Sequence, residues 1–216
     1  MIFAKIDFIN LLPFHIYTKR FIKSTRLKQI INYKKSYPSN INKQFYKNKI
    51  DAAFISSIKS YRCKCLDIGI VAKNEVDSVL LVKGDYLKDS QSDTSNVLAK
   101  VLKLDGEIII GDKALYRFYN EDKDFIDLAQ YWKEKYDLPF VFARLCINNH
   151  YKYFNKLSNN FLNTKVYIPQ YILKQYAKKT NLTVAQIKQY LTKITYKLNY
   201  KEKQSLKLFL QLSKKV

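Results

Sequence analysis

The 216-residue sequence is poor in glycine, proline and repetition. It contains 4 Gly and 4 Pro and shows no internal repeat, which excludes a collagen-like or low-complexity chain. Hydrophobic residues make up 47% of it, as is typical of a globular protein. The length is sufficient for one sizeable α/β domain or for two small lobes.

Acidic residues and arginines are also scarce. The 39 Lys and Arg outnumber the 18 Asp and Glu, giving a net charge of +21, which suggests a nucleic-acid partner. Arginine is the preferred reader of bases and phosphates, yet most of the positive charge is lysine spread along the chain. The abundance of Lys, Asn, Ile, Tyr and Phe is typical of an AT-rich genome. We therefore expect no nucleic-acid partner, although the charge favours a small anionic substrate. The five arginines are Arg20, Arg26, Arg62, Arg117 and Arg144.

The cysteines are too few for a typical metal site. Cys63 and Cys65 share one face of a predicted strand, but Cys146 is the only other cysteine, so no second pair completes a ligand set. We expect three reduced thiols packed as small hydrophobic side chains, and no bound metal.

Long apolar runs are absent as well. The apolar N-terminal stretch is interrupted by Lys5, Asp7, Asn10 and Pro13, and no small-residue cleavage site follows. No segment approaches the length of a membrane span. These features predict a cytoplasmic protein without membrane insertion.

The first half of the sequence alternates predicted strands with short helical segments. This order favours a mainly parallel sheet covered by helices, in which ligands bind beyond the carboxyl ends of the strands. Asn10 and the Ser56–Ser57 pair both fall at such ends. The expected strands are 2–9, 27–33, 50–56, 65–73 and 78–83.

The second half contains a smaller α/β segment and then a helical tail. Residues 92–104 read as a helix with hydroxyl residues at its start, and residues 106–112 as a strand. In the tail, Thr183 and Gln186 form a capping box that opens a helix predicted over 182–198.

Six segments, in order, resemble one known family. They are "IDFINLLPF", "KIDAAFISSIKSYR", "SVLLV", "SDTSNVLAKVL", "IIIGDKALY" and "DLAQYWKEKYDLPFVFA", and together they span residues 1–145. The series resembles chorismate dehydratase of the futalosine route to menaquinone. The combination of "GDKAL" with "DLPFVFA" is the most specific part.

The resemblance implies an α/β, two-lobed fold like that of type II periplasmic binding proteins, with a helical C-terminus. The large lobe would combine residues 1–83 with 139–216, and the small lobe would hold residues 84–138. Strands near 78–82 and 140–146 would cross between the lobes. Family members usually have a longer small lobe, so a trimmed second lobe is expected here.

The resemblance also implies a reaction, in which chorismate loses water to give 3-[(1-carboxyvinyl)oxy]benzoate. That chemistry requires no metal or redox cofactor, so we expect none. Asn10 and Ser78 are the predicted catalytic residues. A neutral amide can donate to a leaving oxygen without the cost of a buried charge. Alternatively, Asn10 caps the following helix and Ser78 is an ordinary strand hydroxyl.

Four hydroxyl residues are predicted to bind the dicarboxylate substrate. Thr94 and Ser95 lie at a helix start, where backbone N–H groups and the helix dipole favour a carboxylate. Simple N-capping is the alternative at that position. Ser56 and Ser57 present similar groups from the other lobe.

Two other functions are compatible with the same fold. One is a non-catalytic protein that binds a small anion, since a fold does not fix a function. The other is the related 1,4-dihydroxy-6-naphthoate synthase, which uses a histidine base. The sequence around His150 does not show that family's pattern, and His15 is expected to be a packing residue.

Overall fold

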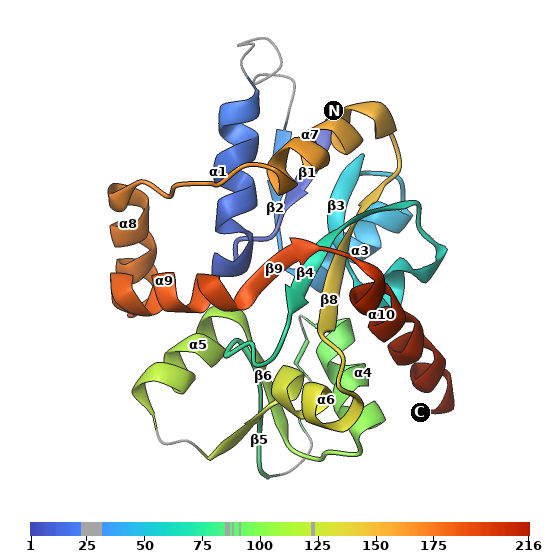
Figure 1. The fold of residues 1–216 in the computed structure, drawn as a ribbon, viewed down its shortest axis with the longest axis vertical. Helices are drawn as coiled ribbons and strands as arrows, with labels where there is room; N and C mark the ends of the chain where they lie inside the picture. Colours follow the sequence, from blue (N-terminus) through green and yellow to red (C-terminus); the bar gives the residue numbers. More distant parts are fainter. Residues whose placement is uncertain (23–31, 85–86, 88, 91, 122–123) are drawn as a thin grey trace.

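The computed structural model describes residues 1–22, 32–84, 87, 89–90, 92–121 and 124–216. Within these ranges the chain forms a six-stranded and a three-stranded sheet. Figure 1 shows the larger sheet above the smaller one, with helices around both. Residues 27–31 of one predicted strand lie outside the described residues.

The larger sheet is mixed rather than mainly parallel. Strands β1 to β4 share one direction, whereas β8 and β9 run opposite to them. The prediction of a mainly parallel sheet was wrong because β8 returns from the smaller sheet and inserts between β3 and β4. The strand order of the larger sheet is β2-β1-β3-β8-β4-β9. The strands are β1 (Ile2–Lys5), β2 (Asn32–Lys35), β3 (Ala52–Ser56), β4 (Cys65–Ala72), β8 (Phe140–Ile147) and β9 (Ile194–Lys197).

Helices from both ends of the chain cover this sheet. Phe14 of α1 contacts Phe54 of β3 and Phe161 of α7, with ring centroids 5.1 Å apart in both pairs. These rings form one apolar core between the first and the last third of the sequence. The surrounding elements are η1 (Ile9–Leu11), α1 (Leu12–Phe21), α3 (Pro38–Tyr46), η2 (Ser57–Arg62), α7 (Tyr151–Leu162), α10 (Tyr200–Leu212) and η3 (Ser213–Lys215).

The smaller sheet is antiparallel, with β5 between β6 and β7. Residues 79–82 therefore pair inside this sheet, whereas residues 140–147 pair only with strands of the larger one. Neither strand passes from one sheet into the other. The division into two lobes stays a prediction. The elements are β5 (Val79–Val82), α4 (Asp93–Leu102), β6 (Glu107–Ile110), α5 (Gly111–Asn120), β7 (Phe125–Asp127) and α6 (Leu128–Tyr136).

The C-terminal tail contains a strand that the sequence analysis missed. The predicted capping box of Thr183 and Gln186 is confirmed, but its helix, α9 (Val184–Lys193), ends before β9 begins. Ile194 and Thr195 are β-branched, and the free edge of β4 offers them backbone partners. Helix α8 (Gln170–Thr180) precedes α9, and Figure 1 shows α9 and β9 running across the junction of the two sheets.

Two of the cysteines are joined. Cys65 of β4 lies opposite Cys146 of β8 and forms a disulfide with it, while Cys63 is free. The prediction of three reduced thiols was therefore wrong. The pairing of two strands 81 positions apart in sequence brings these cysteines together, and sequence spacing does not reveal it. No three His, Cys, Asp or Glu side chains among the described residues are grouped as a metal site, and no helix in that part of the chain could cross a membrane.

His15 is a buried packing residue, and its titration should affect stability. Its Nε2 bonds to the carbonyl of Ile6 at 3.0 Å, and burial lowers the pKa of the imidazole from 6.5 to about 4. Below pH 6.5 the unfolded chain is protonated at His15 while the folded chain stays neutral. We expect the free energy of unfolding to fall by up to about 3 kcal/mol from this group as pH drops from 6.5 to 4. Urea titrations should show a shallower pH slope for His15→Gln, and identical slopes would contradict this.

Candidate active site

Five of the predicted site residues line one small cavity between the two sheets. Asn10 follows β1, Ser56 ends β3, Ser78 precedes β5, and Thr94 and Ser95 lie in the first turn of α4. The remaining wall is apolar apart from Ser92 and includes Ile6, Phe8, Phe54, Ile70, Val79, Ile110 and Phe142. Among the described residues that line the cavity, none has an ionisable side chain.

Ser57 does not belong to this wall. Its hydroxyl donates to the carbonyl of Val141 at 2.6 Å, and its side chain is fully buried. The Ser57 hydroxyl, which the sequence analysis assigned to the substrate, is therefore bonded to the backbone of β8. A role of Ser57 in positioning its neighbour Ser56 remains open to experiment.

Asn10 does not cap the following helix. Helix α1 has Leu11 as its N-cap, with no side-chain hydrogen bond there. Instead, the Oδ1 atom of Asn10 is buried and has no hydrogen-bond partner among the described residues. A buried amide oxygen without a donor is costly, and a ligand that donates a hydrogen bond removes that cost.

Three hydroxyl groups on the opposite side of the cavity each accept a hydrogen bond from the protein. Ser56 Oγ accepts from Asn42 Nδ2 at 2.9 Å, Thr94 Oγ1 from the amide of Ile58 at 3.4 Å, and Ser95 Oγ from Ser92 Oγ at 2.8 Å. Since each oxygen already accepts, its own O–H remains to be donated. This set of donors suits an anionic ligand.

The start of α4 adds the positive end of a helix dipole to that set. Ser92 is the N-cap, and its Oγ accepts from the amide of Ser95 at 3.1 Å. The N-capping alternative for Thr94 and Ser95 is therefore not what the structure shows, because Ser92 performs it. The positive end of the helix dipole points toward the cavity wall and favours a carboxylate.

Ser78 is held by a tyrosine that the sequence analysis overlooked. The hydroxyl of Tyr190, in α9, donates to Ser78 Oγ at 2.9 Å, and both side chains are buried. Burial raises the pKa of Tyr190 above its ordinary value. Tyr190 thus connects α9 with the predicted catalytic residue Ser78.

Two further contacts fix the cavity wall. Tyr196 donates to the carbonyl of Asn10 at 2.6 Å. Gly111 has φ +65°, and its amide donates to the carbonyl of Ser78 at 2.8 Å. A Cβ atom at Gly111 would lie 2.8 Å from the ring of Phe8, so only glycine allows this close approach.

The cavity is too small for an organic ligand in this conformation. Its volume is about 60 Å³, which is room for about two water molecules and far less than the usual 300–1,000 Å³ of a ligand pocket. Asn42 connects Ser56 of its wall with α4, since its Nδ2 lies 2.9 Å from Asp93 Oδ2 as well as from Ser56 Oγ. Binding of an organic ligand therefore requires the residues of the wall to move apart.

Comparison with known proteins decides the family. A family model described as menaquinone biosynthesis matches residues 92–215. A chorismate dehydratase from Campylobacter jejuni is 46% identical over 218 positions, which cover 99% of this chain and 98% of that protein. The chain belongs to the chorismate dehydratase family of menaquinone biosynthesis. Because 98% of the Campylobacter chorismate dehydratase is covered, the small lobe is not trimmed relative to that protein.

Solved structures confirm the fold of this chorismate dehydratase family member. A protein from Archaeoglobus fulgidus matches with a TM-score of 0.68 at 14% identity, covering 99% of this chain and 96% of the other. The aliphatic sulphonate-binding protein SsuA from Escherichia coli matches with a TM-score of 0.57 at 11% identity, covering 99% and 85%. These likenesses establish the α/β periplasmic-binding-protein-like fold.

Proposed function

We propose that the protein dehydrates chorismate to 3-[(1-carboxyvinyl)oxy]benzoate, with the cavity around Asn10 and Ser78 as its active site. The assignment rests on the hydrogen-bonding groups at the cavity. Hydroxyl and amide donors face one acceptor without a partner, Asn10 Oδ1. Chorismate is complementary, since its two carboxylates accept hydrogen bonds and its hydroxyl donates one.

Asn10 and Ser78 would act on the departing hydroxyl. Asn10 Oδ1 accepts a hydrogen bond from that hydroxyl and so orients its oxygen toward Ser78. Ser78 Oγ–H donates to the oxygen as the carbon–oxygen bond breaks, and Tyr190 supports Ser78 in turn. The adjacent ring carbon loses a proton, and the ring becomes aromatic as water forms. The described residues of the wall include no ionisable side chain, so the substrate's own carboxylates are stronger bases than any of these side chains and would take up the proton.

The proposal is tested by incubating the purified protein with chorismate and separating the products by chromatography with mass detection. We expect the enolpyruvyl-ether benzoate to appear without added cofactor. A protein that binds chorismate without converting it would instead be the small-anion binding protein of the alternative hypothesis. Addition of a chelator should leave the rate unchanged.

The naphthoate synthase alternative has weaker structural support. That function depends on a histidine base, yet neither histidine lines the cavity. His15 is bonded to Ile6 in the core, and His150 is exposed at the start of α7. The location of the protein in the cell and the absence of a nucleic-acid partner stay predictions.

Tyr190→Phe should lower turnover about tenfold with little change in KM. The variant keeps the ring but removes the O–H that donates to Ser78, so the loss of about one hydrogen bond falls on the chemical step. Tyr153→Phe is the matched control, because the Tyr153 hydroxyl is buried without a partner among the described residues. Equal turnover in wild type and Tyr190→Phe would remove Tyr190 from the mechanism.

A further inference from the structure

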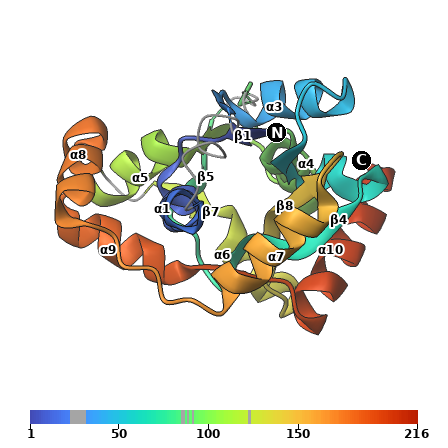
Figure 2. The ribbon, with the colours of Figure 1, turned by 90° about the horizontal axis from the view of Figure 1, so that it is seen from above.

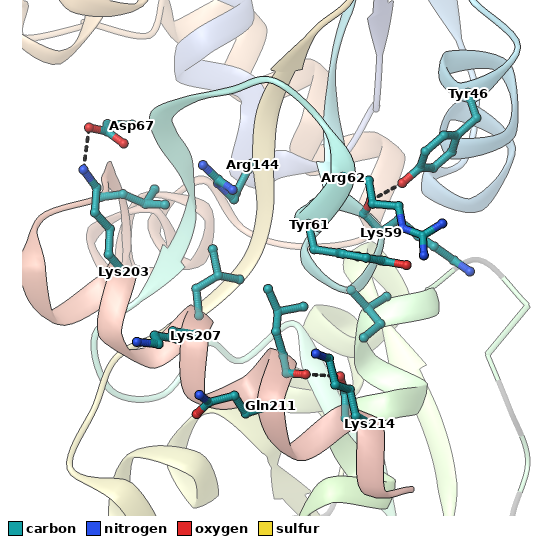
Figure 3. Close-up of a pocket in the computed structure, with 15 residues that line it drawn as sticks. Tyr46, Lys59, Tyr61, Arg62, Asp67, Arg144, Lys203, Lys207, Gln211 and Lys214 are labelled. Carbon is teal, nitrogen blue, oxygen red and sulfur yellow. Dashed lines mark hydrogen bonds and ion pairs between the residues drawn. The ribbon is translucent and has the colours of Figure 1, made fainter.

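A second, larger cavity lies on the outer side of the larger sheet. This basic groove runs between η2 and α10 and has a volume of about 1180 Å³. Figure 3 shows the side chains from both elements that line it. It shares no lining residue with the cavity around Asn10. Its lining comprises Tyr46, Ile58, Lys59, Tyr61, Arg62, Asp67, Arg144, Leu198, Lys203, Leu206, Lys207, Leu210, Gln211, Ser213 and Lys214.

Arg144 extends from β8 at the floor of the basic groove. Its side chain is half-buried, its Nε atom is buried, and its guanidinium has no hydrogen bond or ion pair with any described residue. The nearby Asp67 carboxylate is bonded to Lys203 at 2.6 Å instead. Burial lowers the pKa of Arg144 from its ordinary value, with Asp67 acting in the opposite direction. A buried cation without a partner is costly unless an anion binds it.

Further cations surround this floor on three elements. Lys59 and Arg62 come from η2, and Lys207 and Lys214 from α10 and η3. Lys59, Lys207 and Lys214 form no ion pair within the described part of the chain. Their positive charges are therefore available to a ligand in the groove.

The rest of the lining is apolar or aromatic. Leu198, Leu206 and Leu210 form one wall, and the exposed rings of Tyr46 and Tyr61 lie at the other side. Arg62 stacks on Tyr61, with its guanidinium carbon 5.0 Å from the ring centroid. Such surfaces bind the flat or apolar part of a ligand.

The lysine-rich composition does not explain this arrangement. Lysines are spread over the whole chain, but arginine occurs only five times, and two of the five line the groove. Guanidinium groups bind phosphate through two parallel hydrogen bonds. Six cations against one acidic residue exceed what a dicarboxylate needs, whereas an oligophosphate matches them.

We propose that the basic groove binds an organic oligophosphate, with two or more phosphate groups on Arg144 and the neighbouring cations and an aromatic body against Tyr46, Tyr61 and the leucines. Nucleoside diphosphates and triphosphates have this chemistry. The site is separate from the dehydratase cavity, and the proposal does not rest on the reaction assigned to that cavity.

Isothermal titration calorimetry of the whole protein tests the proposal. ATP, inorganic pyrophosphate and adenosine serve as probes without divalent metal at about 0.15 M salt, where long-range charge effects are screened. We expect ATP to bind most tightly, pyrophosphate more weakly and adenosine weakest. Failure of ATP to bind would overturn the proposal. Pyrophosphate binding as tight as ATP binding would also contradict it, because the aromatic body would then contribute nothing.

Arg144→Gln and Arg20→Gln form a matched pair of variants. Each removes one arginine charge, but Arg20 lies exposed on α1, away from the groove. We expect Arg144→Gln to weaken ATP binding by about 10- to 100-fold, the scale of a charge-assisted hydrogen bond, and Arg20→Gln to change it less than about twofold. Equal weakening in both would show a non-specific charge effect and overturn the assignment.

Two variants of exposed lysines, one at the groove and one away from it, keep the test valid if Arg144→Gln fails to fold. Lys207→Gln should weaken ATP binding by about three- to tenfold, whereas Lys174→Gln should not. Lys174 is exposed on α8, and Figure 2 shows α8 and α10 on opposite sides of the molecule. Equal affinities of the two lysine variants would place the ligand outside the groove.

Discussion

Replacing Asn10 with Leu is expected to reduce chorismate turnover by about 10²–10³-fold, the scale for removal of one preorganised hydrogen-bonding group. The amide contacts the departing hydroxyl in our proposal, so its contribution should be greater in the transition state than in the ground state. Chorismate binding should suffer less, because Ser56, Thr94 and Ser95 still hold the carboxylates. Steady-state kinetics and calorimetric binding on the same preparation separate the two effects.

The stability of Asn10→Leu provides the control. Asn10 Oδ1 has no partner among the described residues, so leucine removes an uncompensated polar atom at similar volume. We expect the thermal midpoint to stay within a few degrees of the wild-type value. A variant that is clearly destabilised but turns over normally per folded molecule would exclude Asn10 from the mechanism.

Replacing Asp127 with Ala is expected to cost about 3–7 kcal/mol of unfolding free energy. One carboxylate oxygen caps α6 by accepting from the amides of Ala129 and Gln130, at 2.9 and 3.1 Å. The other accepts from the amides of Val76 and Asp77, at 2.9 and 2.7 Å. Losing the cap costs about 1 kcal/mol, and each buried amide left without an acceptor adds about 1–3 kcal/mol.

The same substitution should also reduce turnover. The turn that Asp127 holds leads directly into Ser78, whose amide donates to the carbonyl of Val76 at 2.7 Å. Asp127→Asn retains one acceptor and should lose about half as much stability, while the exposed Asp105→Ala should change it by less than about 0.5 kcal/mol. Urea denaturation monitored by Trp132 fluorescence measures all three variants. Equal stability of Asp127→Ala and Asp105→Ala would contradict the assigned role.

Local sequence signals predicted the elements and much of the cavity wall. The strand at 52–56, the helix that follows Ser92 and the capping box at Thr183 all depend on neighbouring residues, so periodicity and capping rules reveal them. Asn10, Ser56 and Thr94 were found because polar groups at strand ends and helix starts stand out against apolar surroundings.

The features that were missed depend on contacts between distant segments. Tyr190 lies on the apolar face of its helix and reads as a core residue, since its hydrogen bond to Ser78 spans 112 positions. Asn42 likewise lies within an amphipathic helix, and its bridge from Ser56 to Asp93 exists only after folding. The Cys65–Cys146 disulfide depends on the insertion of β8 between β3 and β4. No local pattern encodes these pairings.

The position of Tyr190 and β9 after all the other strands in sequence has a consequence for biosynthesis. The ribosome synthesises a chain from its N-terminus, so the segment containing α9, β9 and α10 emerges after strands β1 to β8. Neither Ser78 nor the edge of β4 has its partner until that segment has emerged. The indole of Trp132 likewise has no acceptor until Ser205, to which it donates at 3.0 Å, has been synthesised. A nascent chain therefore exposes an incomplete sheet edge, and nonsense fragments that stop before α9 should be inactive and prone to aggregation.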